Sequence, residues 1–374
     1  MRLKPQQPLY YLNIKTLNIG VHIMTNPFRY LSTAAVLILF LRLLVPADLC
    51  FAQAQEQSAE ATKDYLESMD TLITLTVYGN HREEALQKAR EEILRLDDLL
   101  SIGNPDSEVS RVNRDKMLVL SEDTGSIVQK AMELYHSTDG LFDITILPLM
   151  QLWGFTSGLY HVPSPQELSA ELEKVDAGRL DYDPVTRVLT LDAEQCIDLG
   201  GIAKGFTSQR IMEIFKQCGV TSGLVSLGGN VQCLNRKPDG SDYIIAIRNP
   251  FGEDKGYAAT LSIHNEAVIT SGGYERYFTD EATGKIYQHI MDPHTGIPAE
   301  SDLASVSIIT TDGMLGDGLS TSLYIMGKED AIQYWKEHHT EFQMILVDID
   351  GNVLVTEGLE NRIRTPEQFN VILS

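Results

Sequence analysis

The chain has 374 residues, of which 43% are hydrophobic, so it is long enough to bury one large core or two of ordinary size. Its formal charge of −22 at pH 7 argues against a surface for nucleic acid or anionic lipid. The same charge means that a phosphate-rich ligand needs local cations, supplied by lysine, arginine or a metal ion.

Residues 1–54 have the features of a signal peptide or N-terminal membrane-targeting segment. Basic residues precede an apolar run at 34–41, and residues 52–54 (Ala-Gln-Ala) fit a small-x-small cleavage pattern. The run is shorter than the roughly 20 residues of a membrane span. We therefore expect export to the periplasm or another extracytoplasmic location, with cleavage near Ala54. Lipidation at Cys50, or an uncleaved anchor that attaches the chain to the inner membrane, are the alternatives.

The remaining residues, 55–374, mix strand and helix patterns without a repeat or a long linker. Alternating apolar residues predict strands, and apolar residues three or four apart predict helices. Without regular strand–helix–strand alternation, this order favours a single α+β domain over a doubly wound sheet. In chain order, the expected elements are a strand at 71–79, helices at 81–100 and 121–135, a strand at 188–191, a helix at 203–218, several strands from 223 onward, helices at 315–326 and 329–338, and strands at 342–348 and 352–356.

Three cysteines lie beyond the signal segment, namely Cys196, Cys218 and Cys233. An odd number at irregular spacing indicates neither a disulfide framework nor a zinc site. We expect them to be small buried residues.

A glycine-rich segment, 198–205 (DLGGIAKG), leads directly into the helix at 203–218. Glycine lets the backbone approach a ligand, and the first turn of a helix offers unpaired N–H groups to an anion. Lys204 would add a positive charge. The segment matches neither a P-loop nor G-x-G-x-x-G, and a tight turn without a ligand also explains it.

A second polar position lies in the apolar segment 140–145 (GLFDIT). Asp143 is surrounded there by apolar residues, and a buried carboxylate needs a hydrogen bond or a countercharge. A structural cap and a ligand contact both account for it.

Asp317 and Thr321 lie four residues apart on the helix expected at 315–326, so they share one face. A carboxylate and a hydroxyl suit a hard cation such as Mg²⁺, which keeps waters or substrate phosphates in its shell. The alternative is that the aspartate caps the helix and the threonine packs.

The segment 288–296 (QHIMDPHTG) contains His289, which can act as an acid or base near neutral pH. A buried structural histidine is the other interpretation. A further polar turn, 270–276 (TSGGYER), follows a strand and has no mechanism of its own.

Taken together and in order, these segments resemble the ApbE family, the FAD:protein FMN transferases. The matching stretches run from about residue 65 to 327, nearly the whole chain after the signal segment. They are 69–71 (MDT), 107–113 (SEVSRVN), 140–155 (GLFDITILPLMQLWGF), 198–206 (DLGGIAKGF), 226–230 (SLGGN), 270–278 (TSGGYERYF), 289–298 (HIMDPHTGIP) and 316–327 (GDGLSTSLYIMG).

The resemblance implies a single T-fold-like α+β domain with mixed sheets and flanking helices. It implies Mg²⁺-dependent transfer of FMN from FAD to a threonine or serine of an acceptor flavoprotein, with release of AMP. The implied acceptors are extracytoplasmic flavin subunits of membrane redox complexes. By position, the metal ligands would be Asp317, Thr321 and the carbonyl of Gly201. The flavin-nucleotide contacts would be Met69, Leu141, Phe142, Asp143, Asp198, Lys204 and Thr270, and the reacting centre would include His289 and Asp292.

The chain departs from the family pattern at four positions. Asp70 stands where glycine is usual, and Gly103 stands where an aromatic residue is common. Gln288 replaces a frequent histidine, and Gln209 replaces a common aspartate. None of these removes an implied metal ligand.

Two other functions use the same residues. With water as the nucleophile, the site would be a magnesium-dependent FAD pyrophosphatase that yields FMN and AMP. Without turnover, the chain would be an FAD-binding protein. The sequence does not separate transfer from hydrolysis, because the acceptor lies on another molecule.

Overall fold

The computed structural model describes residues 60–252, 256–367 and 369–373, which belong to one unit that covers residues 56–374. The predicted signal segment, 1–54, and the lipidation alternative at Cys50 lie outside the described residues. In the part of the chain that is described, no helix combines the length and apolar character of a membrane span.

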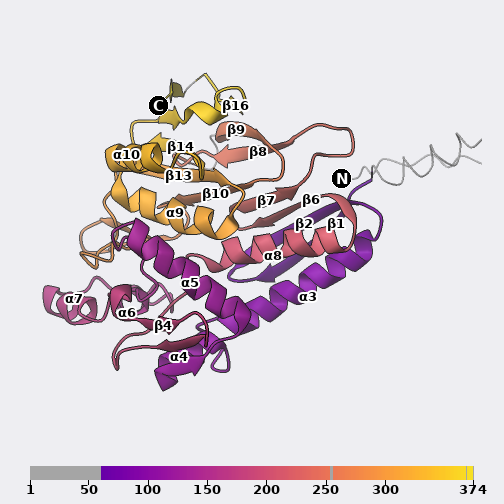
Figure 1. The fold of residues 1–374 in the computed structure, drawn as a ribbon. Helices are drawn as coiled ribbons and strands as arrows, with labels where there is room; N and C mark the ends of the chain where they lie inside the picture. The colour runs from indigo at the N-terminus through magenta and orange to yellow at the C-terminus, as the bar shows by residue number, and fades with distance from the viewer. Residues whose placement is uncertain (1–59, 253–255, 368, 374) are drawn as a thin grey trace, which may run out of the picture. The chain divides into compact units, whose positions relative to one another are not determined.

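A nine-stranded mixed sheet organises the fold (Figure 1). In sheet order, its strands are β1 (Thr62–Ser68), β2 (Thr71–Gly79), β6 (Val220–Leu227), β7 (Asn230–Leu234), β10 (Ala267–Gly272), β13 (Leu303–Thr310), β14 (Gln343–Asp348), β15 (Asn352–Val355) and β17 (Asn370–Leu373). Neighbours are antiparallel apart from β15 and β17, which run parallel. The alternation in β2 places Ile73, Leu75 and Val77 in the core, fully buried.

Helices cover one face of this sheet. The described helices are α3 (Arg82–Leu100), α4 (Glu108–Asp115), α5 (Glu122–Ser137), α6 (Leu147–Leu152), α7 (Pro165–Leu172), α8 (Ala203–Gln217), α9 (Gly313–Met326) and α10 (Lys328–His338), with short 3₁₀ turns η1 (Ala177–Arg179) and η3 (Glu357–Leu359). Helix α3 packs on β1 and β2, α8 on β6 and β7, and α9 on β10 and β13. In Figure 1, α5 lies between α9 and the group that contains α4, α6 and α7.

Three smaller sheets complete the described structure. They are β16-β9-β8, with β16 (Ile363–Arg364), β9 (Tyr257–Ile263) and β8 (Tyr243–Arg248); β3-β5-β4, with β3 (Met117–Val119), β5 (Val188–Thr190) and β4 (Asp181–Asp183); and the hairpin β11 (Tyr277–Thr279) with β12 (Ile286–Gln288). The first covers the other face of the large sheet, through a shared apolar cluster that includes Leu261, Val268 and Ile345.

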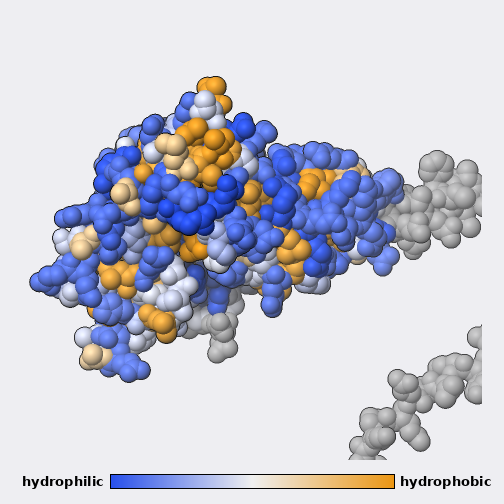
Figure 2. All heavy atoms as spheres, turned by 90° about the horizontal axis from the view of Figure 1, so that it is seen from below, coloured by the Kyte–Doolittle hydropathy of each residue, from blue (hydrophilic) through white to orange (hydrophobic). Residues whose placement is uncertain are grey.

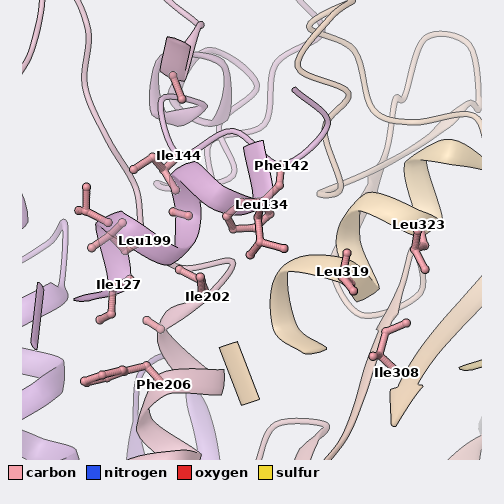
Figure 3. Packing of buried hydrophobic residues seen from close by; sticks show 14 of the residues in the cluster. Ile127, Leu134, Phe142, Ile144, Leu199, Ile202, Phe206, Ile308, Leu319 and Leu323 are labelled. Atoms are coloured by element: carbon pink, nitrogen blue, oxygen red, sulfur yellow. The ribbon is translucent and has the colours of Figure 1, made fainter. Parts of the chain in front are cut away.

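The largest apolar cluster lies between the helices and the large sheet. Figure 3 shows Leu134 of α5 beside Phe142, with Leu319 and Leu323 of α9 and Ile308 of β13 in the same cluster. The face shown in Figure 2 is mostly hydrophilic, with separate apolar patches, in keeping with the acidic composition.

This mixture of helices and largely antiparallel sheets confirms the predicted α+β class. The helix expected at 315–326 begins at Gly313 instead, because the Asp312 side chain accepts a hydrogen bond from Leu315 N at 3.1 Å and caps the helix earlier. The three cysteines are free. Cys233 is buried as predicted, but the prediction is wrong for Cys196 and Cys218, which are only half-buried.

Candidate active site

Helices α8 and α9 meet at a pair of glycines. A Cβ atom on Gly205 would lie 2.1 Å from the carbonyl oxygen of Gly313, and one on Gly313 would lie 2.4 Å from that of Gly205. No side chain fits between backbones this close. The contact also brings the backbone N–H of Gly205 to 2.8 Å from Asp317 Oδ2. The start of α8 and the second turn of α9 therefore form one unit.

Replacing Gly205 by alanine is expected to destabilise the protein, because the added methyl group would overlap the Gly313 carbonyl. Overpacking of this kind costs about 1–3 kcal/mol. Gly103→Ala is the control, since a Cβ there meets only the Ser101 hydroxyl, at 3.5 Å. Denaturant unfolding would compare the two variants, and equal stability would contradict the close contact between the helices.

Asp317 is a buried carboxylate on α9, with only 5% of its surface exposed. Burial raises its pKa, while the charge of Lys204, the amide of Asn230 and the N–H of Gly205 act in the opposite direction. The Asn230 amide faces the carboxylate, although its Nδ2 makes no hydrogen bond of ordinary length within the described structure. Such a carboxylate gains most from a nearby cation.

Thr321 lies one helical turn after Asp317 and is half-buried. Its Oγ1 is 3.3 Å from the hydroxyl of Ser271, which is also 2.7 Å from the hydroxyl of Ser320. The predicted pair therefore does share one face of α9, beside the end of β10.

The segment 198–204 forms the turn that starts α8. Asp198 Oδ1 accepts a hydrogen bond from Gly200 N at 2.8 Å, and Lys204 Nζ donates to the Gly200 carbonyl at 3.3 Å. Gly201 lies exposed at this turn, one helical turn before Gly205. Burial raises the pKa of Asp198, and the Gly200 N–H and the charges of Lys204 and Arg276 oppose that rise.

Phe142 packs against the same turn. A Cβ on Gly201 would lie 3.3 Å from its ring, and one on Gly318 of α9 would lie 3.4 Å from it. The side chain is buried in the main core, and Leu141 next to it is half-buried. Phe142 therefore packs against both the turn and α9.

Asp143 holds local backbone in place. Its Oδ1 accepts from the backbone N–H and hydroxyl of Thr145, at 2.6 and 2.5 Å, and its Oδ2 accepts from Ala177 N at 2.9 Å. Burial raises the pKa of this carboxyl group. Of the two interpretations of the sequence, this geometry favours the structural cap.

The turn that joins β1 and β2 reaches the same region. Met69 and Asp70 both adopt left-handed backbone angles, with φ of 52° and 56°, which explains why glycine suits position 70. Thr207 of α8 places its hydroxyl 3.6 Å from the sulfur of Met69, and the charge of Asp70 raises the pKa of Asp198. Met69 therefore lies beside α8, close to the turn at 198–204 that carries other predicted flavin-nucleotide contacts.

Thr270 lies on β10, but its side chain faces away from α9. Its hydroxyl is 2.7 Å from that of Ser307 on β13. The next residue, Ser271, points to α9 and contacts Thr321. The structure therefore brings Ser271, rather than the side chain of Thr270, to the predicted metal ligands.

His289 follows β12 and is held by the segment that precedes β11. Its Nδ1 lies 3.2 Å from the carbonyl oxygen of Arg276, and because a carbonyl can only accept, Nδ1 carries the proton. Burial and the charges of Arg276 and Lys204 lower its pKa to about 4. The imidazole is therefore neutral at pH 7, with a lone pair on Nε2 that can accept a proton.

Stability should depend on pH through His289. Its pKa is lowered from 6.5 to about 4 in the folded protein, so between these values the unfolded chain binds the proton more readily and stability falls as the pH falls. His289→Gln removes this contribution. The stability advantage of the wild type over the variant should therefore shrink from pH 7 to pH 4, as measured by thermal unfolding. An advantage that stays constant would contradict the lowered pKa.

Asp292 closes a tight turn. Its Oδ1 accepts from His294 N at 2.8 Å and its Oδ2 accepts from the Thr295 hydroxyl at 2.9 Å. The turn is anchored by Trp153, whose Nε1 donates to the Gly296 carbonyl at 2.9 Å. Asp292 thus shapes the segment after His289, and both of its oxygens are engaged there.

Lys204 links the separate parts of the site. Its charge influences the pKa of Asp198, Asp317 and His289, so it lies near all three. The charge of Arg276 also lowers the pKa of Asp198 and of His289. Two cations therefore lie among the predicted ligand-binding groups of an acidic protein, as an anionic ligand requires.

Sequence reasoning missed the contributions of Arg276, Ser271 and Asn230. Arg276 and Ser271 belong to the polar turn at 270–276, and Asn230 ends the SLGGN stretch. Their signal was their position in polar turns, but their partners Asp198, Thr321 and Asp317 become neighbours only through the fold.

The residues fit a hard divalent cation. Within the described ranges, no group of three His, Cys, Asp or Glu side chains could hold a metal ion. A single buried carboxylate with a hydroxyl on the same helix face, beside an exposed glycine turn, instead suits a cation that retains waters and substrate phosphates.

Residues 69–346 match the ApbE family, and the chain belongs to that family. It is 29% identical over 305 residues to an FAD:protein FMN transferase of Klebsiella pneumoniae, covering 80% of this chain and 91% of the relative. It is 30% identical over 297 residues to the protein of the same name from Salmonella typhimurium. That match covers 76% of this chain and 84% of the relative.

Solved structures of ApbE proteins have a similar fold. The fold is similar to the ApbE protein of Thermotoga maritima, with a TM-score of 0.72 and 27% identity over 83% of this chain and 98% of that one. It is also similar to the Pseudomonas stutzeri flavinyl transferase ApbE, with a TM-score of 0.68 and 28% identity. The match covers 77% of this chain and 91% of that one.

Proposed function

We propose that this chain is an FAD:protein FMN transferase that moves FMN from FAD to a threonine or serine hydroxyl of an acceptor protein and releases AMP. The observation that carries the proposal is the buried Asp317, one helical turn from Thr321, with Lys204 beside it. Family membership and the names of the relatives support the same reaction.

The chemistry is a phosphoryl transfer. The acceptor oxygen forms a bond to the phosphorus of the FMN half, and the bond from that phosphorus to the bridging pyrophosphate oxygen breaks. AMP leaves with that oxygen. The hydroxyl proton goes to a base, and His289 is the candidate because its Nδ1 is fixed on the Arg276 carbonyl, which leaves the lone pair on Nε2 to accept the proton.

Asp317 and Thr321 would hold Mg²⁺, with the Gly201 carbonyl as a third ligand from the turn before α8. Bound there, the cation would supply charge stabilisation to the phosphate oxygens. Lys204 and Arg276 would offset the remaining charge of the diphosphate, which a protein with a formal charge of −22 would otherwise repel.

The test is incubation of the protein with FAD, Mg²⁺ and a flavin-site acceptor domain. We expect a fluorescent adduct that survives denaturation, a mass gain of the acceptor equal to FMN less one water, and one AMP per adduct. AMP without adduct would assign the pyrophosphatase reaction instead. FAD binding without AMP would assign a binding protein.

We also propose that the chain works outside the cytoplasm, on flavoprotein subunits of membrane redox complexes. The support is the apolar run at 34–41 and the small residues at 52–54. Mass spectrometry of the protein purified from its native membrane and periplasmic fractions would separate cleavage near Ala54 from lipidation at Cys50 or retention of the anchor. A full-length chain in the cytoplasm would contradict export.

A further inference from the structure

Two antiparallel segments, 286–292 and 297–301, pair at one end and separate at the other. Near the turn, Asp292 N donates to the Ile297 carbonyl at 3.0 Å and Ala299 N donates to the Ile290 carbonyl at 2.9 Å. Further along, the Gln288 side chain replaces the backbone pairing, with Nε2 donating to the Ala299 carbonyl at 2.7 Å. The segments therefore diverge from Gln288 toward Ile286.

A cavity of about 290 Å³ opens where these segments diverge. Its wall includes Ile286, Gln288 and Ser301, with Tyr274 and Tyr324. This lining combines apolar surface with tyrosine hydroxyls, which is common in surfaces that bind polypeptides.

Lys285 and Glu300 line the cavity and pair with each other, with Nζ 2.6 Å from Oε1. The ammonium group is therefore already neutralised, and the cavity offers no net positive charge to a phosphate. On the other side of the hairpin, toward the predicted nucleotide site, the charges of Lys204 and Arg276 lower the pKa of His289.

The outer edge of β12 faces this cavity. His289 N donates to Arg276 O at 3.0 Å on the β11 side, whereas Ile290 O accepts from Ala299 on the outer side. Because the hydrogen-bonding direction alternates along a strand, the backbone groups of Gln288 and Ile286 point outward, toward the cavity. They form an open strand edge.

The cavity and the candidate reacting centre share a wall. The side chains of Gln288 and His289 leave the chain in opposite directions, one into the cavity and the other toward Arg276. In addition, Gln288 Oε1 is buried without a hydrogen-bond partner among the described residues. A buried acceptor atom without a hydrogen-bond partner among the described residues thus lies in the wall of the cavity, one residue from His289.

We propose that an extended segment of the acceptor protein binds here, adding as a strand along the outer edge of β12 and placing an apolar side chain in the cavity. The proposal rests on the proposed transfer reaction, which requires an acceptor hydroxyl beside His289. Backbone N–H and C=O groups at strand spacing match another polypeptide, and pockets for alternate side chains give such binding its selectivity.

Ile286→Pro tests the strand edge directly. Its N–H points outward, so proline removes a group needed for the acceptor without breaking the ladder to β11. Ile286→Glu, at a side chain that is 61% exposed, tests the cavity. For both variants, we expect kcat/KM for the acceptor domain to fall at least tenfold, while the Kd of FAD measured by flavin fluorescence stays unchanged.

Val185→Glu is the control, because Val185 is 85% exposed and lies on the turn after β4, far along the chain from the hairpin. It should flavinylate the acceptor at the wild-type rate. Unchanged acceptor kinetics in both Ile286 variants would overturn the proposal. A rise in the Kd of FAD equal to the loss in kcat/KM would also overturn it, by assigning the cavity to the nucleotide. If the wild type forms no adduct, the transfer reaction itself has failed, which is a separate result.

Discussion

Asp317→Ala is expected to lower FMN transfer by at least about 10²–10³-fold, the scale on which removing one preorganised stabilising group acts. The reason is that Asp317 is the buried carboxylate of α9 that faces Lys204 and would bind the cation. Activity should be measured as AMP release and adduct formation at saturating Mg²⁺. Asp330→Ala, an exposed aspartate on α10, is the matched control and should retain activity.

Asp317→Asn distinguishes a functional role from a structural one. Burial raises the pKa of Asp317 in the folded protein, so the charged form opposes folding as the pH rises through that pKa. In metal-free buffer at pH 7, the asparagine variant should therefore be at least as stable as the wild type while being inactive. A variant that is both active and unchanged in its metal dependence would remove Asp317 from the metal site.

His289→Gln is expected to lower kcat by about 10²–10⁴-fold, the usual contribution of a general base. Because the pKa of His289 is lowered to about 4, its base form persists across neutral and mildly acidic pH. FAD affinity should change little. His161→Gln, at an exposed histidine paired with Glu167, is the control and should behave as the wild type. Wild-type kcat in His289→Gln would assign the proton transfer to another group.

Much of the fold was predictable from local pattern. The alternation in 71–79 and the spacing in 81–100 correspond to β2 and α3, because each has a clear buried face. Helix α7 was missed because none of its residues is fully buried and its apolar face is short, with only the partly buried Leu168 and Leu172 packed on a core cluster. A signal was present nonetheless, since Ser164 and Glu167 form a capping box around Pro165. Strand β1 was missed for a similar reason, with only Leu66 and Ser68 buried.

The candidate site was predictable only where its geometry is local. Asp317 and Thr321 lie on one helix, so their spacing alone places them together. The approach of Gly205 to Asp317 spans 112 positions in the chain and depends on backbone packing that no local pattern encodes.

The carboxylates of Asp143 and Asp292 show how far their roles can be predicted from the sequence. Asp143 and Asp292 each bond a threonine two or three residues further on, and that spacing is a readable sign of a capped turn. A family resemblance assigns such residues to a ligand, whereas their hydrogen bonds show them holding the surrounding backbone. Both roles are compatible, since a fixed backbone positions the neighbours that touch the ligand.

A crystal structure with FAD and Mn²⁺, in which the anomalous signal locates the metal, tests directly whether Asp317 and Thr321 bind the cation. We expect one strong peak bound by the Asp317 carboxylate and the Thr321 hydroxyl, in contact with the diphosphate. A dinucleotide bound with its metal elsewhere, and with both side chains turned away from it, would show that Asp317 and Thr321 are not the metal ligands.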